Sequence, residues 1–177
     1  PTHGRVDIAG AMAMAPTFDT VGWFTAGPGL LRKVGALMLG GDRQDSPVKR
    51  LLVARDAIGF VDDGIARTLA RFLSRASLLP KPQDIAIAPD GFDAWREIFR
   101  TIQAFEVWQT YGDWLSGHDA NPGPGIRERI AFAKTVTPEA CRTARADMEA
   151  ARAKIRAIVE PGTVVLMPAA PCIAPDR

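Results

Sequence analysis

The sequence predicts an α/β fold in which a sheet is covered by helices. Three short apolar segments, 50–56, 84–88 and 163–167, have the length and composition of buried strands. The longer stretches between them repeat apolar residues at three- and four-residue spacings, as amphipathic helices do. Helices that alternate with apolar strands are typical of such sheets. Because three strands are few for a sheet covered on both faces, we expect further strands outside this chain.

The composition is that of a globular protein long enough for one domain with a core. Hydrophobic residues make up 47% of the 177 residues and charged residues 24%, and both values are ordinary for a folded domain. The formal net charge of +2 is too small to indicate a nucleic-acid partner. The longest apolar run, 163–174, contains two prolines and is shorter than a membrane-spanning helix, so we expect no membrane partner.

The first predicted helix, 28–39, begins at a proline, which suits the first turn because the missing N–H needs no partner there. Its apolar residues recur at helical spacing and form one face. They are Leu30, Leu31, Val34, Leu37 and Met38. Gly40 and Gly41 end this helix, and a polar turn at 41–47 leads to the first strand.

Two more helices flank the second strand. One begins after Asp62, a residue type that caps helices, and is stopped by Pro80 and Pro82. The other is long and is expected to run from a cap at Asp93 to about Leu115. Its apolar positions are Trp95, Ile98, Phe99, Ile102, Phe105 and Trp108. Both helices therefore present an apolar face that we expect to be packed.

The last third of the chain has a firm break at 121–125, followed by a short helix at 126–134. The run 137–139 combines a threonine cap, a proline and an acid, which is a strong start for the final helix. Cys141 lies on the apolar face of that helix, so we expect a buried free thiol and not a disulfide with Cys172.

The opening stretch, 1–24, has an unusual pattern of glycines, prolines and small residues. The residues that interrupt regular structure are Pro1, Gly4, Gly10, Pro16 and Gly22, and they surround a run of small residues at 9–15. A surface loop is more polar, and an amphipathic helix has a clearer stripe. We therefore expect irregular backbone packed against a large surface that is encoded upstream, in a larger protein.

The same stretch resembles the amidase signature family. The resemblance is carried by P-T-H-G-R-V at 1–6 and F-D-T-V-G at 18–22, and it is closest to indole-3-acetamide hydrolase-type amidases and their chloroplast-translocon relatives. It extends to L-L-R-K-V-G-A-L-M-L at 30–39, G-P-G-I-R-E-R-I at 123–130 and V-V-L-M-P-A-A-P at 164–171. In the family, the stretch similar to 1–6 lies just after the nucleophilic serine.

The resemblance implies that 1–177 is the central to C-terminal portion of one amidase domain, with an incomplete mixed sheet flanked by helices. It implies hydrolysis of a carboxylic amide through a serine acyl-enzyme. The nucleophilic serine, a second serine that relays protons and a basic lysine all precede Pro1 in the family. We therefore expect no catalytic residue in this chain, and an inactive isolated chain.

The resemblance also implies partners and a location. We expect a small-molecule amide as substrate and the remainder of the amidase polypeptide as partner, with a homodimer as a further option. We expect no cofactor and a cytoplasmic protein, and the two free cysteines agree with a reducing compartment. His3 and His118 lack metal-ligand spacing, so no metal site is predicted.

Two groups of residues are candidates for the site. Asp19 and Arg5 are expected to support the nucleophile indirectly, Asp19 by accepting hydrogen bonds from loop N–H groups. The alternative for Asp19 is direct contact with substrate, and the alternative for Arg5 is a plain ion pair. An aromatic row on the long helix is expected to line the acyl pocket, with core packing as the alternative. It consists of Phe105, Trp108 and Tyr111.

Two other functions remain open from the sequence. One is a non-catalytic, amidase-like interaction module, because the chloroplast relatives use this scaffold without hydrolysis. The other is a glutamine amidotransferase A-type subunit that acts with partner chains in tRNA charging. The stretch F-D-T-V-G-W-F at 18–24 argues against the second, since that branch more often has proline after the glycine.

Overall fold

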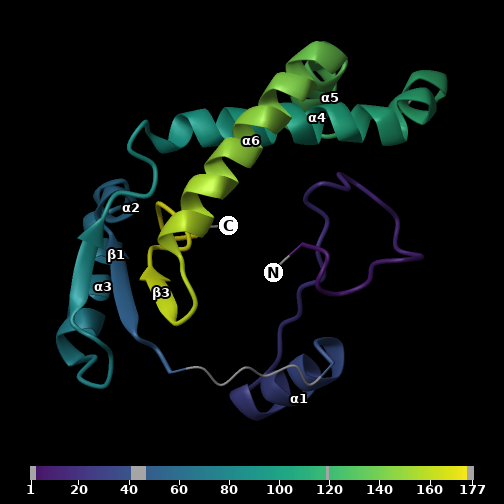
Figure 1. Ribbon diagram of the computed structural model, residues 1–177. Helices are drawn as coiled ribbons and strands as arrows, with labels where there is room; N and C mark the ends of the chain where they lie inside the picture. The colour runs from purple at the N-terminus through teal and green to yellow at the C-terminus, as the bar shows by residue number, and fades with distance from the viewer. Residues whose placement is uncertain (1–2, 41–46, 119, 175–177) are drawn as a thin grey trace. The chain divides into compact units, whose positions relative to one another are not determined.

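A computed structural model describes residues 3–40, 47–118 and 120–174 (Figure 1). The chain forms two compact units, one from 1–44 with 96–148 and the other from 45–95 with 149–177. Nine helices and strands are assigned within the described residues, and their order confirms the α/β class. The helices α4 (Phe92–Gly117) and α6 (Pro138–Ile158) each begin in one unit and end in the other.

The second unit is built on a three-stranded sheet. Its strands are β1 (Arg50–Ala54), β2 (Pro82–Ile85) and β3 (Thr163–Leu166), in the order β2-β1-β3. Both edge strands run parallel to β1. The mixed sheet expected for the whole domain is therefore all parallel in the part described. Leu51 to Ala54 are buried, as is typical of a central strand in a sheet covered on both faces.

The first predicted strand was two residues too long, because Arg55 and Asp56 begin the short helix α2 (Arg55–Gly59). The Asp56 carboxylate accepts hydrogen bonds from the backbone N–H groups of Ala57 and Ala88, at 3.0 and 2.7 Å. This side chain joins the start of α2 to the segment that follows β2. Asp56 therefore ends the strand by giving nearby backbone donors an acceptor outside the sheet.

The second strand lies at Pro82–Ile85, so the prediction of 84–88 was displaced toward the C-terminus. Ile87 and Ala88 are buried, but they lie beyond the last strand pairing. Ile87 packs in a cluster with Ala54 and Ala57. The apolar residues at the end of this run are therefore buried against β1 and α2 without pairing as a strand. Periodicity alone does not distinguish these two cases.

The helix α3 (Asp63–Arg75) begins where it was predicted, but its cap differs. Asp62 occupies the N-cap position without a side-chain cap hydrogen bond. Its carbonyl accepts from Ile65 and Ala66, and its N–H donates to the Pro171 carbonyl at 2.9 Å. Asp62 thus connects α3 to the segment after β3 through its backbone.

The first unit contains α1 (Pro28–Met38), α5 (Ile126–Ala133) and most of α4 and α6. The boundaries of α1 and α5 agree with the predictions to within one residue. The cap predicted at Thr137 is confirmed, since its hydroxyl oxygen accepts from the Ala140 N–H at 3.1 Å. Asp93 lies inside the first turn of α4 and not at its cap.

The apolar faces predicted for α1 and α3 have the expected helical spacing, but no residue of either helix is buried in the described structure. Leu30, Leu31 and Leu37 of α1 are all exposed, and so is Phe72 of α3. The spacing therefore predicted the helices correctly, whereas burial depends on a partner surface. The polar turn predicted at 41–47 lies mostly outside the described residues. Among those described, no helix is long and apolar enough to cross a membrane.

The central strand should dominate the stability of the second unit, and a pair of leucine variants tests this. Leu52 is 1% exposed and Leu78 is 98% exposed. We expect Leu52→Ala to lower the free energy of unfolding by about 3 kcal/mol, because it removes buried methyl groups and leaves a cavity. Leu78→Ala should change it by less than about 0.5 kcal/mol. Urea unfolding followed by far-UV circular dichroism measures both, and equal effects would contradict the assigned core.

Candidate functional site

The opening segment forms a tight turn at 13–19, which contains the start of the F-D-T-V-G stretch. The Asp19 carboxylate accepts from the N–H groups of Met14, at 2.9 Å, and Ala15, at 3.1 Å. The Ala15 carbonyl accepts in return from the N–H groups of Phe18 and Asp19, at 2.8 and 2.9 Å. Asp19 therefore fixes the loop backbone through these hydrogen bonds, and its support of the nucleophile stays a prediction.

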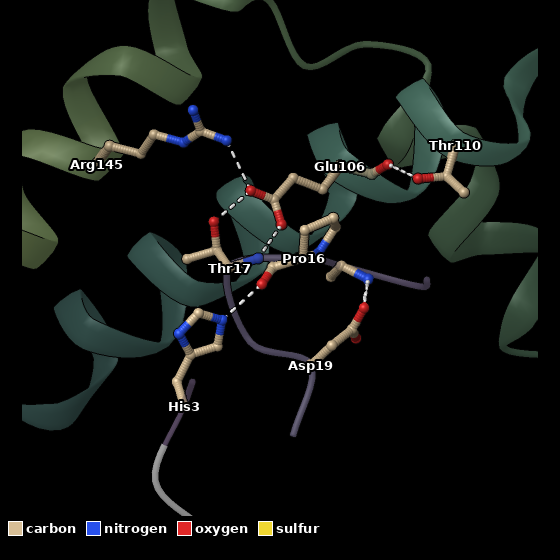
Figure 2. A network of polar contacts seen from close by, with 8 residues as sticks. His3, Pro16, Thr17, Asp19, Glu106, Thr110 and Arg145 are labelled. Carbon is tan, nitrogen blue, oxygen red and sulfur yellow. Dashed lines mark hydrogen bonds and ion pairs between the residues drawn. The ribbon is translucent and has the colours of Figure 1, made fainter. Parts of the chain in front are cut away.

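A buried glutamate on α4, Glu106, accepts hydrogen bonds from this turn (Figure 2). Glu106 is 6% exposed. Its Oε2 accepts from the Thr17 N–H at 2.9 Å, and its Oε1 accepts from the Thr17 hydroxyl. The Arg145 Nη2 group of α6 donates to the same Oε1 at 2.6 Å. The opening segment, α4 and α6 thus meet at one carboxylate, inside the first unit.

The burial of Glu106 makes these contacts necessary. Among the described residues, it is the one polar or charged residue that is buried. A buried carboxylate without donors carries a large desolvation cost, and a charged partner with several hydrogen bonds offsets it. Arg145 is about half exposed, with 49% of its side chain accessible. The guanidinium therefore remains partly hydrated while it donates a hydrogen bond to the carboxylate.

Three further contacts hold the segment. The Tyr111 hydroxyl donates to the Ala13 carbonyl at 2.6 Å. The Phe18 and Phe99 rings meet edge to face, with centroids 4.8 Å apart. The Pro16 carbonyl lies 2.7 Å from the Nε2 of His3 (Figure 2), so this nitrogen carries the proton in that contact. His3 therefore forms a hydrogen bond within the opening segment.

Two members of the aromatic row that is expected to line a pocket, Tyr111 and Trp108, have different neighbours in the structure. Tyr111 contacts the opening segment, whereas Trp108 packs against the backbone of Gly112 and lies beneath the Lys134 ammonium, 5.3 Å from the ring centroid. Phe105 is half-buried and Arg5 is exposed. The acyl-pocket role of the row and the supporting role of Arg5 stay predictions.

At the C-terminal end of α4, His118 contacts Trp114. The His118 Nδ1 lies 2.8 Å from the Trp114 carbonyl, and its ring stacks on that indole at 5.0 Å. This orientation directs the imidazole to Trp114 and not to Ser116. Within the described ranges, His, Cys, Asp and Glu side chains form no group of three that would hold a metal ion.

Sequence reasoning missed Glu106, and a signal for it was present. Glu106 lies four residues after Ile102, which is fully buried, so the two share a helix face. An acid on an apolar helix face indicates a buried ion pair or a buried hydrogen-bonded group. The identity of its partners had no such signal, because Thr17 and Arg145 are 89 and 39 residues away in sequence.

Two arginine variants on α6 test the importance of the buried contact. Arg145 pairs with buried Glu106, whereas Arg142 pairs at 2.8 Å with exposed Glu139. We expect Arg145→Ala to destabilise the chain by about 2 kcal/mol, because a buried carboxylate loses its charged donor. Arg142→Ala, the matched control, should cost less than about 0.5 kcal/mol. Urea unfolding measures both, and a similar small loss for each would show that Arg145 is dispensable.

Cys141 lies close to the same network and is 2% exposed on α6. Burial raises the pKa of its thiol, the nearby Arg145 guanidinium lowers it, and the Glu106 carboxylate adds to the rise. Since the thiolate is the reactive form, the raised pKa and the burial both protect this residue. Cys172 is an exposed free thiol. The expected buried free thiol at Cys141 is confirmed.

This contrast predicts the thiol chemistry of the folded chain. We expect one thiol, Cys172, to react rapidly with a disulfide reagent such as Ellman's reagent at neutral pH. Cys141 should react only after unfolding or at strongly alkaline pH, because its raised pKa keeps it protonated at lower pH. Thiol counting in native buffer and in guanidinium, with Cys172→Ser as control, measures this. Rapid reaction of the Cys172→Ser protein would contradict it.

Comparison with known proteins gives relatives of amidase type. No family model matches the chain. Amidase 1 of Arabidopsis thaliana is 25% identical over 183 residues, a match that covers 84% of this chain and 43% of Amidase 1. The translocon at the outer membrane of chloroplasts 64 of Pisum sativum is 33% identical over 70 residues, 38% of this chain and 12% of that protein. The chain thus spans less than half the length of these curated relatives.

A solved structure described as a crystal structure of amidase shares the fold. It aligns with a TM-score of 0.85 at 20% identity and covers 99% of this chain and 41% of the solved chain. At this identity the structural likeness shows the fold alone. The sequence match to Amidase 1 is separate evidence of similarity to an amidase. Neither comparison singles out a subtype. The chain is thus similar in sequence to Amidase 1 and shares its fold with a solved amidase.

Proposed function

We propose that this chain is the part of an amide hydrolase that supports the reactive centre, while polypeptide outside residues 1–177 supplies the catalytic groups. In this proposal a serine attacks the amide carbonyl, the amine or ammonia leaves, and water hydrolyses the acyl-enzyme to the acid. A second serine relays protons and a lysine acts as base. The amidase similarity of the chain supports the hydrolase class.

The observation that carries this proposal is the way the turn at 13–19 is held. Asp19 binds its backbone from within, and Glu106 and Tyr111 bind it from α4. The resemblance puts the stretch at 1–6 directly after a nucleophilic serine. A nucleophile must be held within fractions of an ångström of its reactive geometry, so its surroundings need locked backbone. A turn whose backbone is held by these three side chains suits that task.

The proposed substrate is a small carboxylic amide, and the proposed pocket wall is the aromatic row on α4. The Tyr111 hydroxyl bond to Ala13 connects that helix to the opening turn, which supports placing the row near the reactive centre. Phe105 and Trp108 are partly accessible and would offer flat apolar surface to an acyl group. Serine acyl-enzyme chemistry calls for no cofactor, and a cytoplasmic location remains part of this proposal.

A second candidate is a non-catalytic interaction module. The match to the chloroplast translocon protein favours it, as do several large apolar side chains that the described structure leaves exposed. In the opening segment and α1 of the first unit they include Met12, Met14, Phe24, Leu30, Leu31 and Leu37. Contiguous exposed apolar surface marks interaction sites. The same surface also suits contact with the remainder of a longer amidase polypeptide, so activity has to decide between the two.

The test compares the 177-residue chain with the full polypeptide encoded by its reading frame. We expect the full polypeptide to release ammonia from indole-3-acetamide or a simpler amide, and the isolated chain to release none. A fluorophosphonate probe should label a serine that mass spectrometry maps outside 1–177. Labelling of Ser116 or turnover by the isolated chain would show that the active site is misplaced. A full polypeptide with neither turnover nor labelling would favour the interaction module.

A further inference from the structure

We propose that Glu106 is a positioning residue, which fixes the turn at 13–19 through Thr17 and is itself held by Arg145. The contact geometry of the first unit carries the positioning of the turn. Its importance for amide hydrolysis rests on the proposed function. Of the residues singled out from the sequence, Asp19 acts within the turn, and Tyr111 binds the Ala13 carbonyl through a neutral hydroxyl.

The hydrogen-bond pattern requires a carboxylate at this position. Oε2 accepts from the Thr17 N–H, while Oε1 accepts from the Thr17 hydroxyl and from Arg145. Both oxygens therefore face donors, and two of these donors, a backbone N–H and a guanidinium, cannot accept. An ionised carboxylate is an acceptor at both oxygens, which makes it suited to this site.

Glutamine has nearly the same shape, but it fails at one of the two positions. If its NH₂ group replaces Oε2, it faces the Thr17 N–H, and two donors oppose each other. If the NH₂ group replaces Oε1, the Thr17 hydroxyl can turn to accept from it, but the Arg145 guanidinium then faces a donor. Either orientation leaves a donor unsatisfied in a site where Glu106 is almost fully buried.

Thr17 transmits the effect of Glu106 to the whole turn. It lies between Ala15, whose carbonyl accepts from Phe18 and Asp19, and Asp19, whose carboxylate accepts from Met14 and Ala15. Thr17 is held by its backbone and by its side chain, so both its position and its rotamer are fixed. Loss of the Glu106 bonds would leave the turn attached to α4 by Tyr111 and by the Phe18–Phe99 contact.

This arrangement predicts local loosening and not global unfolding when Glu106 is changed. The sheet of the second unit is stabilised by its own core, around Leu52 and Val53. Amide hydrogen exchange separates the two cases, because exchange by local opening increases only at the residues that lose their bonds. The measurement uses the 177-residue chain and needs no activity.

The first experiment compares Glu106→Gln with Glu97→Gln, a matched change at an exposed glutamate of the same helix. We expect Glu106→Gln to speed exchange of peptides covering 14–19 by about tenfold or more, with exchange of 51–54 unchanged. Glu97→Gln should leave both regions as in the wild type. Wild-type protection of 14–19 in the Glu106→Gln protein would overturn the proposal.

Thr17 variants keep the test decisive if Glu106→Gln fails to fold. Thr17→Val removes the hydroxyl bond and keeps the backbone bond, so exchange at 14–19 should rise by a smaller factor, about threefold. Thr17→Ser keeps both bonds and should resemble the wild type. Equal exchange in the valine and serine variants would show that the side-chain contact with Glu106 positions nothing.

The second experiment measures turnover in the full polypeptide. We expect Glu106→Gln to lower kcat by about tenfold with KM nearly unchanged, because a misplaced support affects the reacting geometry more than substrate binding. Glu97→Gln should change neither constant. Faster exchange with unchanged kcat would overturn the role in the reaction. Absence of turnover in the wild type would sink the proposed function and that role together, while exchange still decides whether Glu106 holds the turn.

Discussion

The arrangement of the first unit depends on one buried carboxylate, which needs hydrogen-bond donors. Glu106 lies on the packed face of α4 and is almost fully shielded from water, with 6% of its surface exposed. Two donors of Thr17 and one of Arg145 replace that water. Because the charge is costly to bury without partners, the opening segment and α6 are held at defined positions on α4. A polar contact thus gives this unit specificity that apolar packing alone does not supply.

The second unit follows a different rule, in which a buried strand sets the arrangement. β1 is apolar from Leu51 to Ala54 and pairs with a parallel strand on each side, so its backbone groups are satisfied within the sheet. Asp56 ends this strand and holds the segment after β2 against α2. The cluster of Ala54, Ala57 and Ile87 then fills the space between these elements. Here a carboxylate controls where the strand stops, while apolar burial provides the stability.

The buried carboxylate of the first unit and the buried strand of the second unit both agree with the proposed role as a supporting part of an amide hydrolase. The second unit contains the parallel sheet, and the first unit contains the Glu106 network that holds the turn at 13–19. The exposed apolar side chains of α1 and of the opening segment offer surface to further polypeptide. Under the proposed function, this scaffold serves hydrolysis when other polypeptide supplies the reactive serine, and the alternative proposal uses the same surface for protein interaction. The two proposed functions therefore differ in which polypeptide contacts the exposed apolar surface.

The sequence by itself determined the α/β class, the helix starts at Pro28 and Thr137, and the supporting role of Asp19 in its own turn. These features are local, since they depend on residues within a few positions of one another or on a repeated spacing. Tertiary structure alone decided which apolar segments pair as strands, which helix faces are buried, and that Glu106 joins Thr17 to Arg145. Each of these depends on groups that are far apart in the chain, and their meeting is fixed by desolvation and packing, which no short stretch of sequence encodes.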